Sequence, residues 1–146
     1  MRKIIIVLCL LVSGTIANGQ EIGVRFGDAI GGNVAVDMVL SIGDFSRVHA
    51  DVSFGSGLGI EALYDMIYRP LGEAEGFYWY VGVGPFIDID DPFQMGVSGE
   101  IGLEYRFDFP LVIGADYRPS FRIVEDTDFL WDGFGLNVRW DFGAPQ

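Results

Sequence analysis

The stretch LEYRFDFPLVIGADYRPSF, residues 103–121, sets charged side chains two residues apart among strongly apolar neighbours. Glu104 and Arg106 alternate with Leu, Tyr and Phe, and Asp116 and Arg118 alternate in the same way further on. Successive side chains of a β-strand point to opposite faces, so both halves predict a strand with one charged and one apolar face. A soluble barrel would turn the apolar face inward, whereas a membrane barrel would turn it outward.

The first residues of the chain predict a secretory signal peptide. Two basic residues precede an apolar run over 4–12, and Ala17 and Gly19 stand three and one positions before a cleavage site. The run is too short to span a bilayer as a helix, which needs about 20 residues. We therefore expect residues 1–19 to be removed and residues 20–146 to form one barrel domain.

The predicted mature chain is strongly acidic. Seven basic residues, all of them arginine, stand against 21 Asp and Glu residues. Nucleic-acid binding and polybasic attraction to anionic lipid both need a basic surface, so the composition excludes both. The single cysteine, Cys9, lies in the predicted signal peptide, and the mature chain therefore forms no disulfide.

Alternation with a period of two residues recurs along the mature chain and predicts an all-β fold. Glycine occurs 21 times and recurs too often for long helices. Short turns at 43–46, 70–76 and 108–110 are expected at the periplasmic end, and the longest loop, 119–132, at the other end. The eight predicted strands cover 21–29, 34–42, 47–55, 58–69, 77–87, 95–107, 111–118 and 133–142.

The two faces of these strands differ in charge. One face carries aliphatic and aromatic residues without a formal charge, and the other carries the charged residues together with most of the glycines. Glycine weakens a strand, but in a narrow interior it leaves room for long side chains beside it. We therefore expect the charges inside, as a lumen charge network of Arg25, Asp37, Glu61, Asp65, Glu100, Glu104, Arg106, Asp116, Arg118, Arg139 and Asp141.

The turn around Phe109 sets the register of two strands. A turn centred on this residue places Glu100 opposite Arg118, where the two side chains can pair. Eight strands enclose an interior that side chains fill, so we expect a plugged, ion-paired core and not a wide diffusive pore. The inward set, counted with Asp51 and Arg69, has eight carboxylates and five arginines, and water, His49 or protonation has to absorb the difference.

Aromatic residues gather at the strand ends that lead into the predicted periplasmic turns. Such rings at one level are typical of the interfacial belt of a membrane barrel. The predicted aromatic girdle consists of Tyr68, Phe77, Trp79, Tyr105, Phe107, Trp140 and Phe142.

With its leader, its eight alternating strands and the closing FGLNVRWDF (134–142), the chain resembles the small eight-stranded outer-membrane β-barrel family of the OmpA/OmpX type. The resemblance implies an antiparallel up-and-down transmembrane β-barrel in the cell outer membrane, in contact with lipid and lipopolysaccharide. It also implies the barrel-assembly machinery as a partner during biogenesis. The tail at 143–146 departs from the family pattern, in which the chain ends on the aromatic residue, here Phe142.

We expect a structural or surface-interaction role without enzymatic activity, cofactor or metal. One alternative is a soluble secreted or periplasmic barrel that binds a small apolar ligand. The other is an enzyme that modifies lipid A through His49, because His49, Asp51 and Ser53 share the polar face of one strand. His49 points inward, away from the entry side of outer-leaflet lipid, and we favour a hydrogen-bonding role for it.

The acidic loops are the remaining candidate sites. Clustered carboxylates can hold calcium, but neither loop has the residue spacing of an EF-hand, and solvation accounts for both. Three apolar residues in the longest loop, Phe129, Leu130 and Trp131, are candidates for contact with a surface partner or with lipid head groups. The acidic residues are Asp88, Asp90, Asp91, Glu125, Asp126, Asp128 and Asp132.

Overall fold

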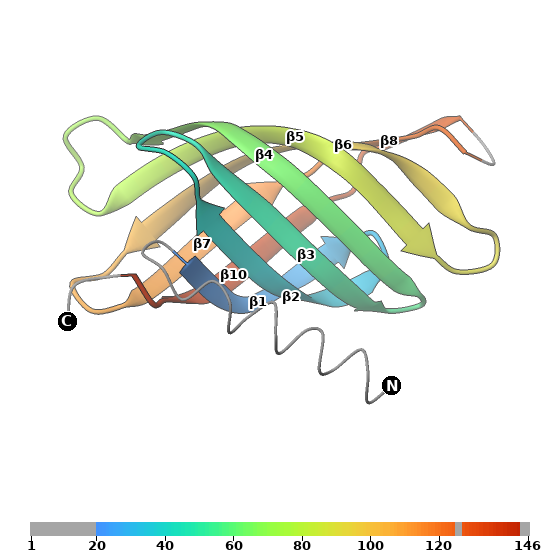
Figure 1. Ribbon diagram of the computed structural model, residues 1–146, viewed down its shortest axis with the longest axis horizontal. Coiled ribbons are helices and arrows are strands. Elements are labelled where there is room, and N and C mark those ends of the chain that lie inside the picture. Colours follow the sequence, from blue (N-terminus) through green and yellow to red (C-terminus); the bar gives the residue numbers. More distant parts are fainter. Residues whose placement is uncertain (1–19, 125–126, 144–146) are drawn as a thin grey trace.

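A computed structural model describes residues 20–124 and 127–143, which form a closed antiparallel β-barrel (Figure 1). The predicted signal peptide lies outside the described residues. Within them, no helix has the length and hydropathy needed to cross a bilayer. The barrel strands are β1 (Gln20–Ala29), β2 (Gly32–Ser41), β3 (Arg47–Gly55), β4 (Leu58–Pro70), β5 (Phe77–Ile89), β6 (Gln94–Arg106), β7 (Leu111–Tyr117) and β10 (Phe134–Asp141).

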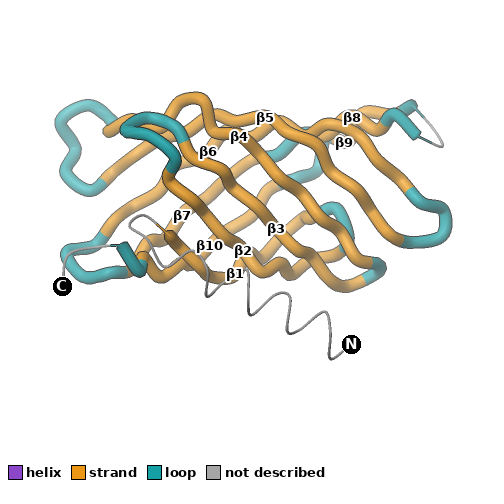
Figure 2. The backbone as a smooth tube through the Cα atoms, viewed as in Figure 1, coloured by secondary structure: helices purple, strands orange, loops and turns teal. Residues whose placement is uncertain are grey.

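Each barrel strand pairs with its neighbour along the chain, and β10 closes the ring by pairing with β1 (Figure 2). The turns β2–β3, β4–β5 and β6–β7 lie at one end, called here the turn end, and the remaining connections lie at the other, the loop end. The all-β, eight-stranded antiparallel prediction is confirmed over the described residues. Each strand begins and ends within two residues of its predicted bounds.

The loop predicted at 119–132 contains a hairpin that the alternation did not reveal. Strands β8 (Ser120–Arg122) and β9 (Asp128–Leu130) pair with each other, and β8 also pairs with β6 at Gly96–Ser98. Because β6 extends beyond the end of β7, its edge would otherwise be open there, and β8 takes up the pairing.

The barrel is polar inside and apolar outside. Every charged strand residue that is not buried lies within two residues of a strand end. The outward positions are large and apolar, including Val24, Ile101, Leu103, Leu136 and Val138, each at least a third exposed. The soluble alternative predicted an apolar interior, whereas the interior of the described barrel is lined largely by charged side chains.

Inward glycines make space for the charged side chains. A Cβ on Gly135 would collide with the guanidinium of Arg25, and one on Gly114 would lie 2.6 Å from Asn137 Oδ1. A Cβ on the outward Gly99 would meet nothing closer than 3.8 Å. The steric requirement for glycine is therefore strong inside the barrel and absent at this outward position.

A β-bulge in β4 reverses two of the predicted orientations. The register between β4 and β5 shifts between Asp65 and Ile67, so the residues beyond the shift point to the opposite faces. Tyr68, predicted in the outer girdle, turns inward and its hydroxyl donates to Glu104 Oε1 at 2.8 Å. Arg69, predicted inside, is exposed, with its guanidinium carbon 3.6 Å from the ring centroid of Phe45.

Candidate functional site in the barrel interior

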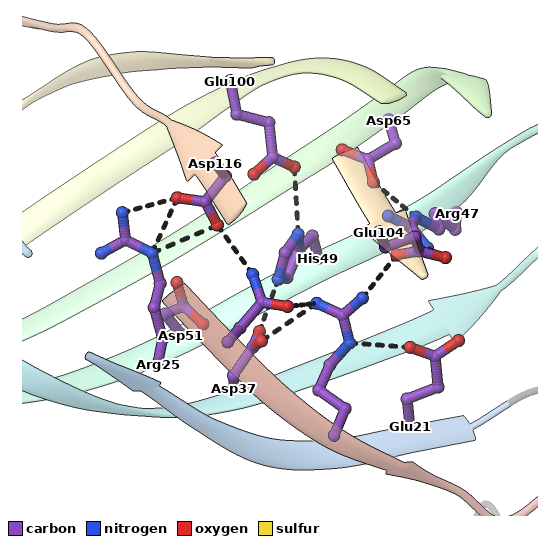
Figure 3. A network of polar contacts seen from close by, with 12 residues as sticks. Glu21, Arg25, Asp37, Arg47, His49, Asp51, Asp65, Glu100, Glu104 and Asp116 are labelled. Carbon is purple, nitrogen blue, oxygen red and sulfur yellow. Dashed lines mark hydrogen bonds and ion pairs between the residues drawn. The ribbon is translucent and has the colours of Figure 1, made fainter. Parts of the chain in front are cut away.

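The interior is organised around arginines, most of which bind two or more carboxylates (Figure 3). Arg118, directly after β7, donates from Nε to Glu100 Oε2 at 2.9 Å and from Nη1 to Glu61 Oε1 at 2.8 Å. The same guanidinium also pairs with Asp51. The predicted pair of Glu100 and Arg118 is thus present, in the predicted register of β6 and β7.

A second cluster lies toward the loop end of the interior. Arg25 binds Asp116 through two donors, Nε at 2.9 Å and Nη2 at 2.6 Å, and its Nη2 also donates to the carbonyl of Gly133 at 2.9 Å. Asn137 Nδ2 donates to the other oxygen of Asp116 at 3.0 Å. A carboxylate that accepts from an arginine fork and an amide is well compensated for its burial.

The third cluster fills the turn end around Glu104. This carboxylate accepts from Arg47 at 3.0 Å, from Arg139 at 2.5 Å and from Arg106 at 3.1 Å. Arg139 also donates to Asp37 at 3.1 Å. Glu104 therefore links charged residues of β2, β3, β6 and β10 across the barrel.

Two members of the network were missing from the predicted set. Arg47 donates from Nε to Asp65 Oδ2 at 2.7 Å, and Glu21 accepts from Arg139 at 2.7 Å and also pairs with Arg106. Both stand at strand ends. Arg47 lies two residues before His49 and Glu21 four residues before Arg25, and these even spacings were the signal for their orientation. The described interior holds nine carboxylates and five arginines: Glu21, Asp37, Asp51, Glu61, Asp65, Glu100, Glu104, Asp116 and Asp141, with Arg25, Arg47, Arg106, Arg118 and Arg139.

His49 lies at the centre of this network and is fully buried. Its Nε2 lies 2.5 Å from Asp37 Oδ1, and its Nδ1 lies 3.1 Å from Glu100 Oε1. Ser53 Oγ instead accepts a hydrogen bond from the Gly31 N–H at 3.1 Å. The residues proposed for hydrolysis thus bind separate partners, and the described structure does not assemble them into a nucleophile and its base.

Rings on the outer wall gather at the turn end. Phe77 and Tyr105 lie 4.8 Å apart between ring centroids, as do Tyr105 and Phe107, and Phe109 extends the row. Trp79, Trp140 and Phe142 also face outward there, so six of the seven predicted girdle residues are on the outer wall and Tyr68 is not. A group at the loop end was not predicted and includes Phe26, Phe54, Tyr117 and Phe134.

The acidic loops provide fewer groups of potential metal ligands than the barrel interior does. Among residues 20–124 and 127–143, the groups of three or more side chains with metal-ligating geometry are all inside the barrel and contain His49. Asp88, Asp90 and Asp91 form no such group, and Glu125 and Asp126 lie outside the described residues. A cavity of about 230 Å³ opens at the loop end, with Arg25, Glu61 and Arg118 in its lining.

Three comparisons with known proteins gave no match. No protein-family model, no curated protein and no solved structure matches the chain. The function of the protein is therefore inferred from the chemistry of the barrel interior and of its outer wall.

Proposed function

We propose that the chain is an integral β-barrel of the cell outer membrane, of the OmpA/OmpX type, with a structural or surface-interaction role. The observation that carries this proposal is an apolar wall, free of charge except near the strand ends, around a closed barrel whose other charges are inside. Exposed apolar patches of this extent are rare on soluble monomers, because contact between apolar surface and water is unfavourable. The hydrocarbon core of a membrane accommodates an apolar wall, provided that every backbone group is paired within the barrel.

The closed ring meets that condition. Each of the eight strands is hydrogen-bonded on both sides, so no strand edge faces outward between the two ends. The rings of Phe77, Tyr105 and Phe107 at one end, and of Tyr117 and Phe134 at the other, lie where a membrane barrel carries its aromatic belts. Lipid, lipopolysaccharide and the barrel-assembly machinery are the partners that follow from this proposal.

The lumen acts as a packed core in this proposal and not as a conduit. Arg25, Arg47 and Arg139 are each about 1 % exposed, and their ion pairs cross the interior. Interaction with other molecules is then left to the loop end. The β8–β9 hairpin carries Phe121, Phe129 and Trp131 on its surface, with Trp131 72 % exposed, and is the candidate surface for an extracellular partner.

Electrophoresis of membrane fractions tests the proposal. Closed barrels resist SDS until they are heated, because every backbone group is paired. We expect the chain in the outer-membrane pellet, with a gel mobility that changes on boiling. A chain found in the soluble fraction, with the same mobility before and after boiling, would contradict the proposal.

A pair of arginine substitutions tests contact with lipid directly. Val138 lies mid-strand on the outer wall and pairs with Val24 and Ile113, whereas Ile42 is exposed beside a turn. In lipid, Val138→Arg is expected to reduce the free energy of unfolding by about 2–4 kcal/mol and Ile42→Arg by about 0–1 kcal/mol. If the wall faces water instead, both substitutions will have equally small effects on urea unfolding.

A further inference from the structure

We propose that His49, Asp65 and Glu100 bind one divalent transition-metal ion inside the barrel. One ligand atom of each residue lies within 4.8 Å of the other two. The three side chains come from β3, β4 and β6 and are fully buried. This group is called the lumen metal site below, and it does not depend on where in the cell the barrel resides.

The hydrogen bonding of His49 leaves one ring nitrogen facing an acceptor. Neutral histidine carries a single N–H. If Nε2 donates to Asp37 Oδ1 at 2.5 Å, then Nδ1 directs its lone pair toward Glu100 Oε1, only 3.1 Å away. A cation between these two acceptors removes their repulsion. A carboxylate on the far nitrogen, here Asp37, is the usual support of a metal-bound histidine.

One carboxylate oxygen of Asp65 lacks a hydrogen-bond partner in the described structure. Its Oδ2 accepts from Arg47 at 2.7 Å, but its Oδ1 is buried without a hydrogen-bond partner in the described structure. This free oxygen is directed toward Glu100 and His49 (Figure 3). An unsatisfied buried carboxylate oxygen is costly, and coordination to a cation satisfies it.

Distances and ligand types indicate the class of metal. Bonds of about 2.1 Å in a tetrahedron separate ligand atoms by about 3.4 Å, close to the 3.1 Å between His49 Nδ1 and Glu100 Oε1. One imidazole and two carboxylates suit Zn²⁺, Co²⁺ or Mn²⁺, whereas Ca²⁺ and Mg²⁺ prefer oxygen ligands alone. The excess of four carboxylates over arginines in the interior favours a cation there.

The neighbouring group of Asp37, His49 and Asp51 is a weaker candidate. Asp37 and His49 are already hydrogen-bonded at 2.5 Å, which leaves no space for an ion between them, and Arg118 pairs with Asp51. A proton on His49 would also join Asp37 to Glu100 without metal. Arg118 Nη2 lies 3.1 Å from His49 Nε2 and 3.4 Å from Nδ1, so its charge opposes an imidazolium and a bound cation alike, and metal analysis distinguishes the two.

Metal analysis of the purified full chain tests this proposal. The protein is refolded in detergent with Co²⁺ or Zn²⁺ present, since the site is enclosed in the folded barrel, and is then passed through a desalting column. We expect one ion per chain, and for Co²⁺ a visible absorption band whose intensity reports the coordination geometry of the bound ion. Asp65→Asn and Glu100→Gln are expected to abolish both signals, whereas Ca²⁺ is not retained.

Asp141→Asn is the matched control, because it removes an inward carboxylate that pairs with Arg106 away from the metal site. It is expected to retain one ion per chain, and the heat-dependent mobility shift shows which variants have folded. If Glu100→Gln does not fold, the metal content of Asp65→Asn and the Co²⁺ spectrum of the native chain still show whether the lumen metal site binds an ion. A metal-free native protein, or equal metal in native protein and Asp65→Asn, would overturn the proposal and leave a bound proton as the bridge.

Discussion

Single arginines determine how well the buried charges are compensated, and Arg118 is the clearest case. Arg118 forms ion pairs with Asp51, Glu61 and Glu100, and its side chain is 4 % exposed. Arg118→Met keeps much of the volume but leaves three buried carboxylates without this partner. Loss of one partner of a buried pair typically costs about 3–5 kcal/mol, and we expect at least this decrease in the free energy of unfolding.

Urea unfolding of the folded barrel in detergent measures this change, with Arg69→Met as the control. Arg69 is exposed and stacks on Phe45, so its substitution is expected to cost at most about 1 kcal/mol. Equal losses for the two variants would show that the interior pairs add nothing to stability.

Gly135 tests the steric role of the inward glycines. A Cβ here would collide with the guanidinium of Arg25, which Asp116 and the Gly133 carbonyl hold in place. Overpacking of this kind costs about 1–3 kcal/mol, and we expect Gly135→Ala to lower the urea midpoint accordingly. Gly99→Ala, on the open outer wall, is expected to change stability by less than about 0.5 kcal/mol. A stability loss at Gly99 as large as at Gly135 would contradict the difference between the faces.

Alternation predicted which side chains share a face, but not which of them meet. Glu100 and Arg118 were predictable as partners because they face each other across one turn. Arg139 and Asp37 belong to β10 and β2, which are not paired, and their contact depends on the curvature of the closed barrel. Tyr68 was placed wrongly because a bulge adds one residue and inverts the alternation, and the sequence around Asp65 carries no mark of it.

The strands differ in how strongly the sequence specifies them. The eight barrel strands have seven to thirteen residues, enough for the two-residue period to be read. Strands β8 and β9 have three residues each, which is too short for a period to appear. The hairpin forms because β6 offers an unpaired edge beyond β7, a condition set by relative strand lengths and not by the loop residues themselves.

Proline substitutions distinguish barrel strands from the appended hairpin. Leu136 belongs to β10, which is paired on both sides, and its backbone is part of the closure with β1. Phe129 belongs to β9, at the end of the sheet, and its N–H donates to the side chain of Asp128 at 2.8 Å. Both side chains are exposed, so the two variants differ mainly in the backbone pairing that proline removes.

We expect Leu136→Pro to abolish the heat-dependent mobility shift and Phe129→Pro to preserve it. Leu136→Ala serves as the control for loss of the side chain alone and is expected to retain the shift. Loss of the shift in Phe129→Pro would mean that the hairpin is required for the barrel to close.

The whole molecule combines an apolar wall, a closed strand ring and an interior crowded with ion pairs, and the last of these determines conduction. The cavity at the loop end, about 230 Å³, adjoins Arg25, Glu61 and Arg118, whose ion pairs occupy the barrel beneath it. An ion that passed through would have to separate these pairs and lose its own hydration in a narrow, already compensated interior. We therefore expect no sustained single-channel current from the native chain in planar bilayers, even when heat-dependent mobility of the same sample verifies folding. A stable open state in most insertions would contradict a plugged lumen and would require the ion pairs to rearrange in the membrane.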